Sequence, residues 1–503
     1  TNECGTVSEG DTKPEEKNGR KSERFIVLRS QGNHSSRDLD EGRSRRIMES
    51  LKGKMSGTLS PESISTGLQR VAKLSKERLK MVWTTLAHHI DLELLKEAYR
   101  HTRKTGAVGV DGQTAEEYGK NLEENLQSLL QRLKSGTYKA PPVRRVYIPK
   151  GDGRRMRPIG IPTFEDKVLQ RAVVMVLEAV YEQDFLNCSY GFRPGRSAHQ
   201  ALAKLWKDLM NTDGGFVVEI DIERFFDTLD RAHLRKFLDK RVQDGIIRRI
   251  IDKWLKAGIL EEGQIQDAEQ GTPQGGVISP LLANVFLHEV LDQWFEQEVK
   301  PRMSGDVFLV RYADDALMVF TLEKDARKVM AVLPKRFGRF GLSLHPEKTR
   351  LLDFRRPQLT ARLGISGQDR KPKVFDFLGF THYWGKTRRG GYAVKRKTAK
   401  DRFGRSLKRV GQWCRNNRHL PLGIQHQNLT RKLQGYYQYY GIMGNQRALT
   451  RFLYELKRIW RKWLARRSQK RNMPWDRFIR LLTRYSLPEP YMRRLAEPIA
   501  ARP

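Results

Sequence analysis

The sequence predicts an α+β fold followed by an α-helical C-terminal region. Gly215–Ile222 alternates apolar and polar side chains as a strand does, and Asp166–Tyr181 reads as an apolar-rich helix. The C-terminal region is marked by charge, because residues 381–503 hold 31 Lys and Arg against 5 Asp and Glu in a helical pattern. We therefore expect a mixed core with a basic helical extension.

Taken in order, the chain divides into five expected segments. Residues 1–60 are polar and charged and are predicted to be disordered. Helical periodicity fills 61–142, and short strands alternate with helices over 143–380, with a hairpin turn at 151–153. Residues 381–485 are expected to be helical, with Leu449–Ser468 as one amphipathic helix, and residues 486–503 form a basic tail.

Net charge restricts the class of partner. The 503 residues carry +37, which favours a polyanion, either nucleic acid or an anionic membrane surface. No run approaches the ~18 apolar residues of a membrane span. Cys4, Cys188 and Cys414 are isolated, so neither a disulfide framework nor a cysteine-based zinc site is expected, and a reducing intracellular compartment fits. No secretory signal is visible at the N-terminus.

The acidic pair in Tyr312-Ala313-Asp314-Asp315 is the sharpest chemical signal. It lies between two apolar runs, which predicts a hairpin that presents carboxylates at its tip. Adjacent carboxylates repel unless a cation lies between them, and two-metal phosphoryl transfer uses such ligands. The alternative is an Asp-Asp turn in solvent.

Two further segments support the metal interpretation. Asp221 ends a predicted strand, so its carboxylate can approach the hairpin tip, as in palm-type polymerases. Taken alone, Asp221 could instead cap a helix. Between the acids lies the glycine-rich segment Gln270–Pro280, whose paired glycines allow close backbone approach and which could also be an ordinary loop.

Together these segments resemble reverse transcriptases encoded by mobile group II introns, the maturase-reverse transcriptases. The resemblance runs from about Leu92 to about Tyr485. Its motifs stand in the family's order, namely Gly109–Gly112, Arg157–Pro162, Tyr190–Ser197, the segment around Asp221, Pro273–Gly276, Tyr312–Asp315, Gly341–Lys348 and Phe377–Phe380.

The resemblance implies a right-hand polymerase, with fingers and palm followed by an α-helical thumb or maturase domain. It also implies roles for matching residues. The catalytic acids that hold two Mg²⁺ ions would be Asp221, Asp314 and Asp315, with the Ile222 carbonyl as a further ligand and Lys348 as general acid. For Lys348 the alternative is a solvated lysine at a helix end.

The same resemblance implies nucleotide and primer contacts. Lys150 and Arg157 would bind the triphosphate, Phe226 would exclude a 2′-hydroxyl, and Gln274 would lie near nucleotide and template. The alternatives are surface cations for the first two and core packing for Phe226. The primer grip would be Phe377, Leu378, Gly379 and Phe380, although a buried apolar strand looks the same in sequence.

Nucleic-acid contacts are expected from cations in the second fingers motif and in the C-terminal region. These are Arg193, Arg196, Arg431, Lys432, Arg461, Lys462, Arg466 and Arg467. The aromatic residues among the C-terminal cations are expected to pack in a core.

The implied activity is RNA-templated DNA synthesis from dNTPs on a DNA primer or target, together with binding of the parent intron RNA to assist splicing and retrohoming. No endonuclease domain is expected, because no Cys follows Cys414. Priming would then come from another 3′ end. A bacterial cytoplasmic location with nucleoid or ribonucleoprotein association is expected. The sequence does not decide between a monomer and a homodimer. The alternatives are a splicing maturase with a vestigial polymerase site and a reverse transcriptase domesticated for defence or repair.

Overall fold

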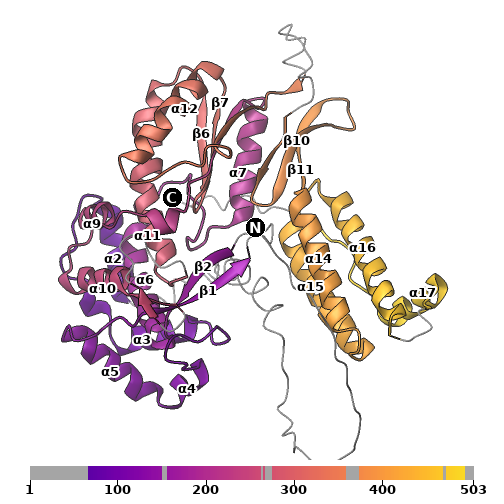
Figure 1. Cartoon of the computed structure of the whole chain (residues 1–503). Helices are drawn as coiled ribbons and strands as arrows, with labels where there is room; N and C mark the ends of the chain where they lie inside the picture. The colour runs from indigo at the N-terminus through magenta and orange to yellow at the C-terminus, as the bar shows by residue number, and fades with distance from the viewer. Residues whose placement is uncertain are drawn as a thin grey trace, which may run out of the picture.

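The structure is a computed structural model that describes residues 66–149, 156–261, 264–266, 275–357, 373–467 and 472–492. It confirms the mixed α and β composition: three sheets are surrounded by helices (Figure 1). The predicted disordered segment 1–60, the predicted turn at 151–153 and the tail beyond Met492 lie outside the described residues. No described helix has the length and apolarity that crossing a membrane would require.

The central sheet has the strand order β6-β7-β3-β8 and is antiparallel throughout. Its strands are β6 (Val307–Tyr312), β7 (Asp315–Phe320), β3 (Phe216–Ile220) and β8 (Arg350–Asp353). The predicted strand at 215–222 and the predicted hairpin are therefore confirmed. Helix α12 (Glu323–Gly338) packs against β3, β7 and β8, and α7 (Ala198–Asn211) packs against β6.

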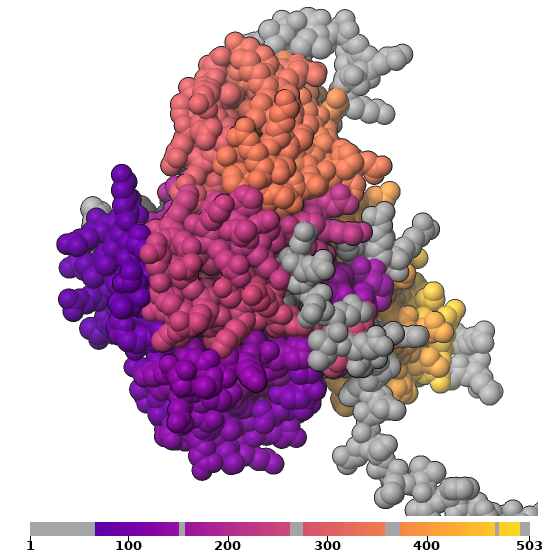
Figure 2. Space-filling view, turned by 60° about the vertical axis from the view of Figure 1, so that its left-hand side comes forward, coloured from indigo at the N-terminus to yellow at the C-terminus, as the bar shows by residue number. Residues whose placement is uncertain are grey.

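N-terminal helices form a second body beside this sheet (Figures 1 and 2). Helix α6 is its long buried member, and Thr163 caps it by accepting from Asp166 N. Its apolar side chains share a core with the N-terminal helices and with one face of β3 and β7. The helices are α2 (Thr66–Glu77), α3 (Leu92–His101), α4 (Ala115–Lys120), α5 (Leu122–Lys134), α6 (Phe164–Tyr181), α9 (Arg231–Asp239), α10 (Gly245–Lys256) and α11 (Ser279–Leu287).

A smaller sheet has the order β2-β1-β4-β5. Strands β1 (Val143–Pro149) and β2 (Met156–Ile161) pair antiparallel, and β1 pairs parallel with β4 (Ile259–Glu261), which pairs with β5 (Gln264–Gln266). This hairpin lies between the N-terminal helices and the central sheet (Figure 1).

The C-terminal region begins with strands, so the prediction of helix from Thr381 onward is wrong for its first eighteen residues. Strands β9 (Phe375–Phe377), β10 (Phe380–Lys386) and β11 (Tyr392–Thr398) form an antiparallel sheet. The many cations hid the alternation, because Arg396 of β11 is buried while Lys395 and Lys397 are not.

Helices complete the C-terminal region. They are α14 (Lys400–Asn416), α15 (Leu422–Tyr440), α16 (Gln446–Ala465) and α17 (Trp475–Arg484). Helix α16 matches the predicted amphipathic helix, and its buried apolar face includes Phe452, Leu456 and Trp460. These helices share one core with α7 and with the second face of the central sheet, to which Val217, Val310 and Val319 contribute.

Candidate active site

A tight turn presents the acidic pair. Tyr312 and Asp315 close the β6–β7 hairpin, which leaves Ala313 and Asp314 as its two turn residues. Ala313 adopts a φ of 57°, in the left-handed region that a non-glycine residue rarely occupies. The predicted carboxylates thus lie at the hairpin tip.

Strand register relates this tip to Asp221. Strands β3 and β7 pair Ile220 with Ala316, so continuing the antiparallel register by one residue sets Asp221 opposite Asp315. Residues that are directly opposite have Cβ atoms about 5 Å apart. Asp221, which directly follows β3, and Asp315, the first residue of β7, therefore lie at neighbouring strand ends.

The backbone around Asp221 is hydrogen-bonded to the segment that precedes β8. The Asp221 carbonyl accepts a hydrogen bond from His345 N at 2.9 Å, and Glu223 N donates to Ser343 O at 2.8 Å. These two bonds flank the bridge of Ile222 with Leu344 and do not use the N–H or carbonyl of Ile222. The Ile222 carbonyl accordingly points away from that partner segment.

The Asp221 side chain faces a cation. Lys348 Nζ lies 3.2 Å from both of its carboxylate oxygens. Within the described ranges, no three His, Cys, Asp or Glu side chains lie together closely enough to hold a metal ion. The donor set still suits a hard divalent cation in kind, because carboxylate and carbonyl oxygens are its preferred ligands and Asp221 already pairs with positive charge.

The predicted nucleotide contacts are only partly described. Lys150 and Gln274 lie outside the described residues. Arg157 is half-buried on β2, opposite Ile148 of β1. Gly275, which directly follows Gln274, has a φ of 122°, and a Cβ there would lie 2.5 Å from the Gly160 carbonyl oxygen. Gly275 therefore lies directly against the backbone of β2.

A chain of buried hydrogen bonds positions the end of that segment. Gln170 Oε1 accepts from Val277 N at 2.7 Å, and Gln170 Nε2 donates to Asp166 at 3.0 Å. Tyr138 and Trp254 each donate to the other Asp166 oxygen at 2.6 Å. Burial raises the pKa of Asp166 to about 6, although its three donors act in the opposite direction.

Phe226 lies in the short helix α8 (Phe225–Thr228), five residues after Asp221. The preceding Arg224 takes a left-handed φ of 47°, which turns the chain sharply after Asp221. The Phe226 ring is half-buried and packs edge-on against Phe225 at 5.3 Å, whereas Phe225 is fully in the core. Phe226 thus keeps an accessible edge, as a residue that contacts a ligand must.

The predicted primer grip is a hairpin turn. Phe377 pairs with Phe380, and Leu378 and Gly379 between them have φ values of 49° and 80°. Tyr439 of α15 donates its hydroxyl hydrogen to the Leu378 carbonyl at 2.7 Å. The turn is therefore attached to the C-terminal helices.

Arg193 is a correction to the predicted nucleic-acid contacts. It is only 3% exposed, and its guanidinium pairs with Glu182 and donates to the carbonyls of Leu186 and Ser189 at 2.8 and 2.9 Å. A side chain whose donors are used internally has none to offer to a phosphate. Arg196 is half-buried and donates to Asn187 at 2.7 Å.

The C-terminal cations fall into two groups. Arg431, Lys432, Lys462 and Arg466 are exposed on α15 and on α16 or its C-terminal end. Arg461 and Arg467 also serve the fold, because Arg461 donates to Met473 O at 2.8 Å and Arg467 donates to Leu420 O at 3.1 Å. The first group presents exposed positive charge, although Lys432 also lies over the Trp413 ring at 5.4 Å and Arg466 over the Trp463 ring at 5.0 Å.

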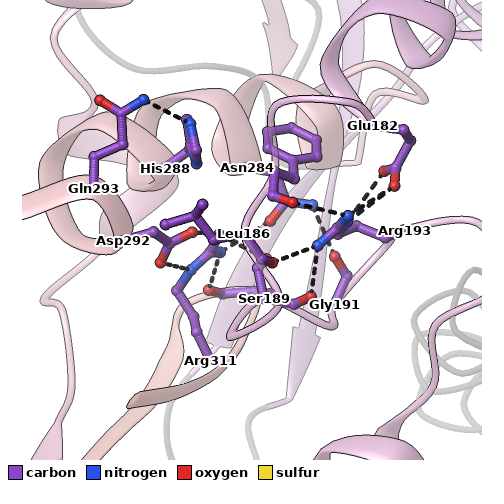
Figure 3. A network of polar contacts seen from close by, with 12 residues as sticks. Glu182, Leu186, Ser189, Gly191, Arg193, Asn284, His288, Asp292, Gln293 and Arg311 are labelled. Atoms are coloured by element: carbon purple, nitrogen blue, oxygen red, sulfur yellow. Dashed lines mark hydrogen bonds and ion pairs between the residues drawn. The ribbon is translucent and has the colours of Figure 1, made fainter. Parts of the chain in front are cut away.

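A buried polar cluster that the sequence did not predict joins Arg311 to Asp292, Asn284 and Ser189 (Figure 3). Its centre is Arg311, which lies two residues before Ala313. Arg311 pairs with Asp292. The sequence signal for this cluster is Arg311 itself, a lone cation in a strand whose other residues, Phe308–Val310 and Tyr312, are apolar or aromatic. A cation at such a position is rarely buried without a partner.

Comparison with known proteins shows which proteins the chain is similar to. A family model described as reverse transcriptase (RNA-dependent DNA polymerase) matches residues 148–382. "Group II intron-encoded protein LtrA" of Lactococcus lactis subsp. cremoris is 40% identical over 251 residues, 48% of this chain and 41% of that protein. "Protein YkfC" of Escherichia coli K12 is 41% identical over 211 residues, 41% of this chain and 55% of that protein.

A more distant match is "Nuclear intron maturase 2, mitochondrial" of Arabidopsis thaliana, 29% identical over 175 residues, 27% of this chain and 24% of that protein. The chain spans about half the length, or less, of the curated relatives it matches. Residues 148–382 thus match the reverse transcriptase family model, and the predicted resemblance of the chain to group II intron-encoded proteins is confirmed.

Proposed function

We propose that this chain is the RNA-directed DNA polymerase of a mobile group II intron. It adds deoxynucleotides to a primer 3′-hydroxyl along an RNA template and releases pyrophosphate. The observation that carries the proposal is the β3–β7 register, which sets Asp221 opposite Asp315 within the residues that match the reverse transcriptase family model.

The proposed organisation is a right hand. The β1–β2 hairpin and the N-terminal helices over 61–142 serve as fingers, and the central sheet serves as palm within residues 143–380. Helices α14 to α17 serve as the thumb, within residues 381–485. Support comes from the attachment of the Leu378–Gly379 turn to Tyr439, which links the predicted primer grip to these helices.

Each site residue then has a chemical task. Asp221, Asp314, Asp315 and the Ile222 carbonyl would hold two Mg²⁺ ions, which when bound lower the pKa of the attacking hydroxyl and stabilise charge on the leaving oxygen. Lys348, which pairs with Asp221, would give a proton to the departing pyrophosphate.

The remaining residues of the site bind and select the nucleotide. Arg157 and Lys150 would bind the triphosphate, and Gln274 would lie near the nucleotide and the template. Phe226 rejects ribonucleotides, because its ring would clash with a 2′-hydroxyl.

A second task is to bind the parent intron RNA, to assist its splicing and to support target-primed reverse transcription during retrohoming. The exposed cations Arg431, Lys432, Lys462 and Arg466 support this task, since release of counterions from RNA phosphates drives association with such a surface. The splicing chemistry itself would belong to the RNA.

Primer extension on poly(rA)/oligo(dT) tests the activity, with Asp314→Asn as the variant. We expect synthesis by the parent chain, loss of synthesis in Asp314→Asn, and unchanged binding of intron RNA. A parent chain that binds intron RNA without extending primers would favour a splicing maturase with a vestigial polymerase site. Synthesis by Asp314→Asn at the parental rate would overturn the assignment of the site.

A further inference from the structure

A buried guanidinium supports the turn that carries Asp314. Arg311 is fully buried, and each of its five N–H donors has an acceptor (Figure 3). The acceptors are the two Asp292 carboxylate oxygens at 2.7 and 2.6 Å, Asn284 Oδ1 at 2.9 Å, Ser189 Oγ at 2.7 Å and the Ala313 carbonyl at 3.0 Å.

The bond to Ala313 acts on the backbone of the turn itself. Ala313 has the left-handed φ of 57°, a strained conformation that persists only where its surroundings hold it. The turn also lies against the backbone of Gly191, where a Cβ would come within 2.3 Å of Ala313 N. The loop that contains Gly191 thus packs directly against the backbone of the turn.

Asn284 joins the two sides of this contact. Its Oδ1 accepts from Arg311, and its Nδ2 donates to the Gly191 carbonyl at 2.7 Å. Ser189 joins them as well, because its hydroxyl accepts from Arg311 and its carbonyl accepts from Arg193. Loop and hairpin therefore share one hydrogen-bond network.

Helix geometry explains how Asn284 and Asp292 reach the same guanidinium. Eight residues of α-helix are about 2.2 turns, so these two side chains would diverge by roughly a fifth of a turn. Here α11 continues into the π-helical segment His288–Asp292, whose wider turns reduce this divergence. The π-helical segment thus allows Asn284 and Asp292 to bind the same guanidinium, that of Arg311.

Stability alone does not explain this cluster. A buried ion pair is often replaceable by apolar residues without loss of stability. What distinguishes Arg311 is the direction of its contacts, since one donor binds the turn and the others bind two separate elements that border it.

We infer that Arg311 is a positioning residue for DNA synthesis: it fixes the turn of Asp314 and Asp315 by holding the Ala313 carbonyl against the loop of Ser189 and Gly191. This inference rests on the proposed function. It assigns to Arg311, Asn284 and Ser189 a role in the geometry of the site without contact to substrate.

Arg311→Lys tests the inference, because an ammonium has three donors and cannot reproduce the planar fork. The matched control is Arg241→Lys, since Arg241 is also buried and paired, with Asp184, but donates to the carbonyls of Leu79 and Met81 instead of the hairpin turn. We expect kcat of primer extension to fall about 100-fold in Arg311→Lys, with the KM for dNTP changed less than about threefold. The control should keep kcat within about threefold.

Hydrogen exchange of a peptide that covers residues 312–316 supplies a readout independent of activity. Exchange should be at least about tenfold faster in Arg311→Lys than in the parent chain, and unchanged in Arg241→Lys. If Arg311→Lys does not fold, Ser189→Ala can replace it, because this variant removes only one acceptor of Arg311. In Ser189→Ala, kcat should fall several-fold and exchange at 312–316 should be several-fold faster.

Parental kcat together with parental exchange at 312–316 would overturn the inference while leaving the polymerase proposal intact. A parent chain without polymerase activity would refute the proposed function instead. Exchange at 312–316 would then still decide whether Arg311 fixes the turn.

Discussion

Lys348 Nζ lies 3.2 Å from both carboxylate oxygens of Asp221. The ammonium therefore occupies one side of a carboxylate that is proposed to bind divalent cations. Because Lys348 is exposed, this pair contributes little to folding, and its consequences concern the site.

Removal of this charge should separate two effects. In Lys348→Gln, we expect the half-saturating Mg²⁺ concentration to fall several-fold, because no ammonium competes for Asp221. We also expect kcat to fall about 10- to 1,000-fold, because the proposed proton donor is lost. Titration of primer extension with Mg²⁺ measures both. Lys240→Gln, which breaks the exposed pair with Glu289, is the control and should change neither. An unchanged kcat in Lys348→Gln would exclude it as the proton donor.

The accessible edge of Phe226 should determine sugar selectivity. Phe226→Ala removes the ring that would clash with a 2′-hydroxyl, so the ratio of kcat/KM for dNTP over rNTP should fall about 10- to 100-fold. Single-nucleotide incorporation with dTTP and UTP on poly(rA)/oligo(dT) measures it. Phe226→Tyr keeps the ring and should retain selectivity. If Phe226→Ala lowers both rates equally, the ring serves only packing.

Asp166 should make stability depend on pH in a recognisable way. Its folded pKa of about 6 lies above the value of 3.8 expected for an exposed Asp, so the folded state retains this proton after the unfolded state has lost it. The contribution of Asp166 to stability is thus complete below about pH 4 and declines as the pH rises to about 6. The total change is about 3 kcal/mol.

Urea unfolding of the parent chain and of Asp166→Asn, at intervals from pH 4 to pH 7, measures this contribution. The free energy of unfolding of the parent chain relative to the variant should decline across that interval and then level off. A difference that stays constant with pH would mean that Asp166 does not titrate there.

The exposed C-terminal cations should govern the salt dependence of RNA binding. Replacing Arg431, Lys462 and Arg466 by Gln should weaken intron RNA binding and reduce the slope of log K against log[salt] by roughly 2, since each lost phosphate contact removes about 0.7 on single strands. Replacing Arg70, Lys73 and Lys76 of α2 removes the same charge elsewhere. Equal slopes for the two triple variants would place the RNA surface outside α15 and α16.

Much of the site follows from local sequence pattern, and the errors arise where distant segments decide the outcome. The Tyr312–Asp315 hairpin was predictable, because its apolar runs and its polar centre are contiguous. The burial of Arg193 was not, since it depends on Glu182 and on the carbonyls of a loop that folds back on it. Asp292 could not be assigned to Arg311 because a π-helical register has no evident sequence signature.

The C-terminal strands show the same limit. Strand β11 places Arg396 in the core, where it donates to the Leu202 carbonyl of α7, so its polarity pattern resembles that of a basic surface helix. Only the paired partner β10 and the buried face of α7 reveal it as a strand. The family resemblance indicated the order of motifs, whereas packing determined which cations remain accessible.

The core that α14 to α17 share with the second face of the central sheet has a thermodynamic consequence. A ligand that binds the folded chain stabilises everything that unfolds together with its binding surface. If intron RNA binds the basic helices, its binding energy also opposes the opening of the strands that carry Asp221 and Asp315. Binding would then stabilise both partners: the protein in the fold that its polymerase site requires, and the RNA in the fold that splicing requires.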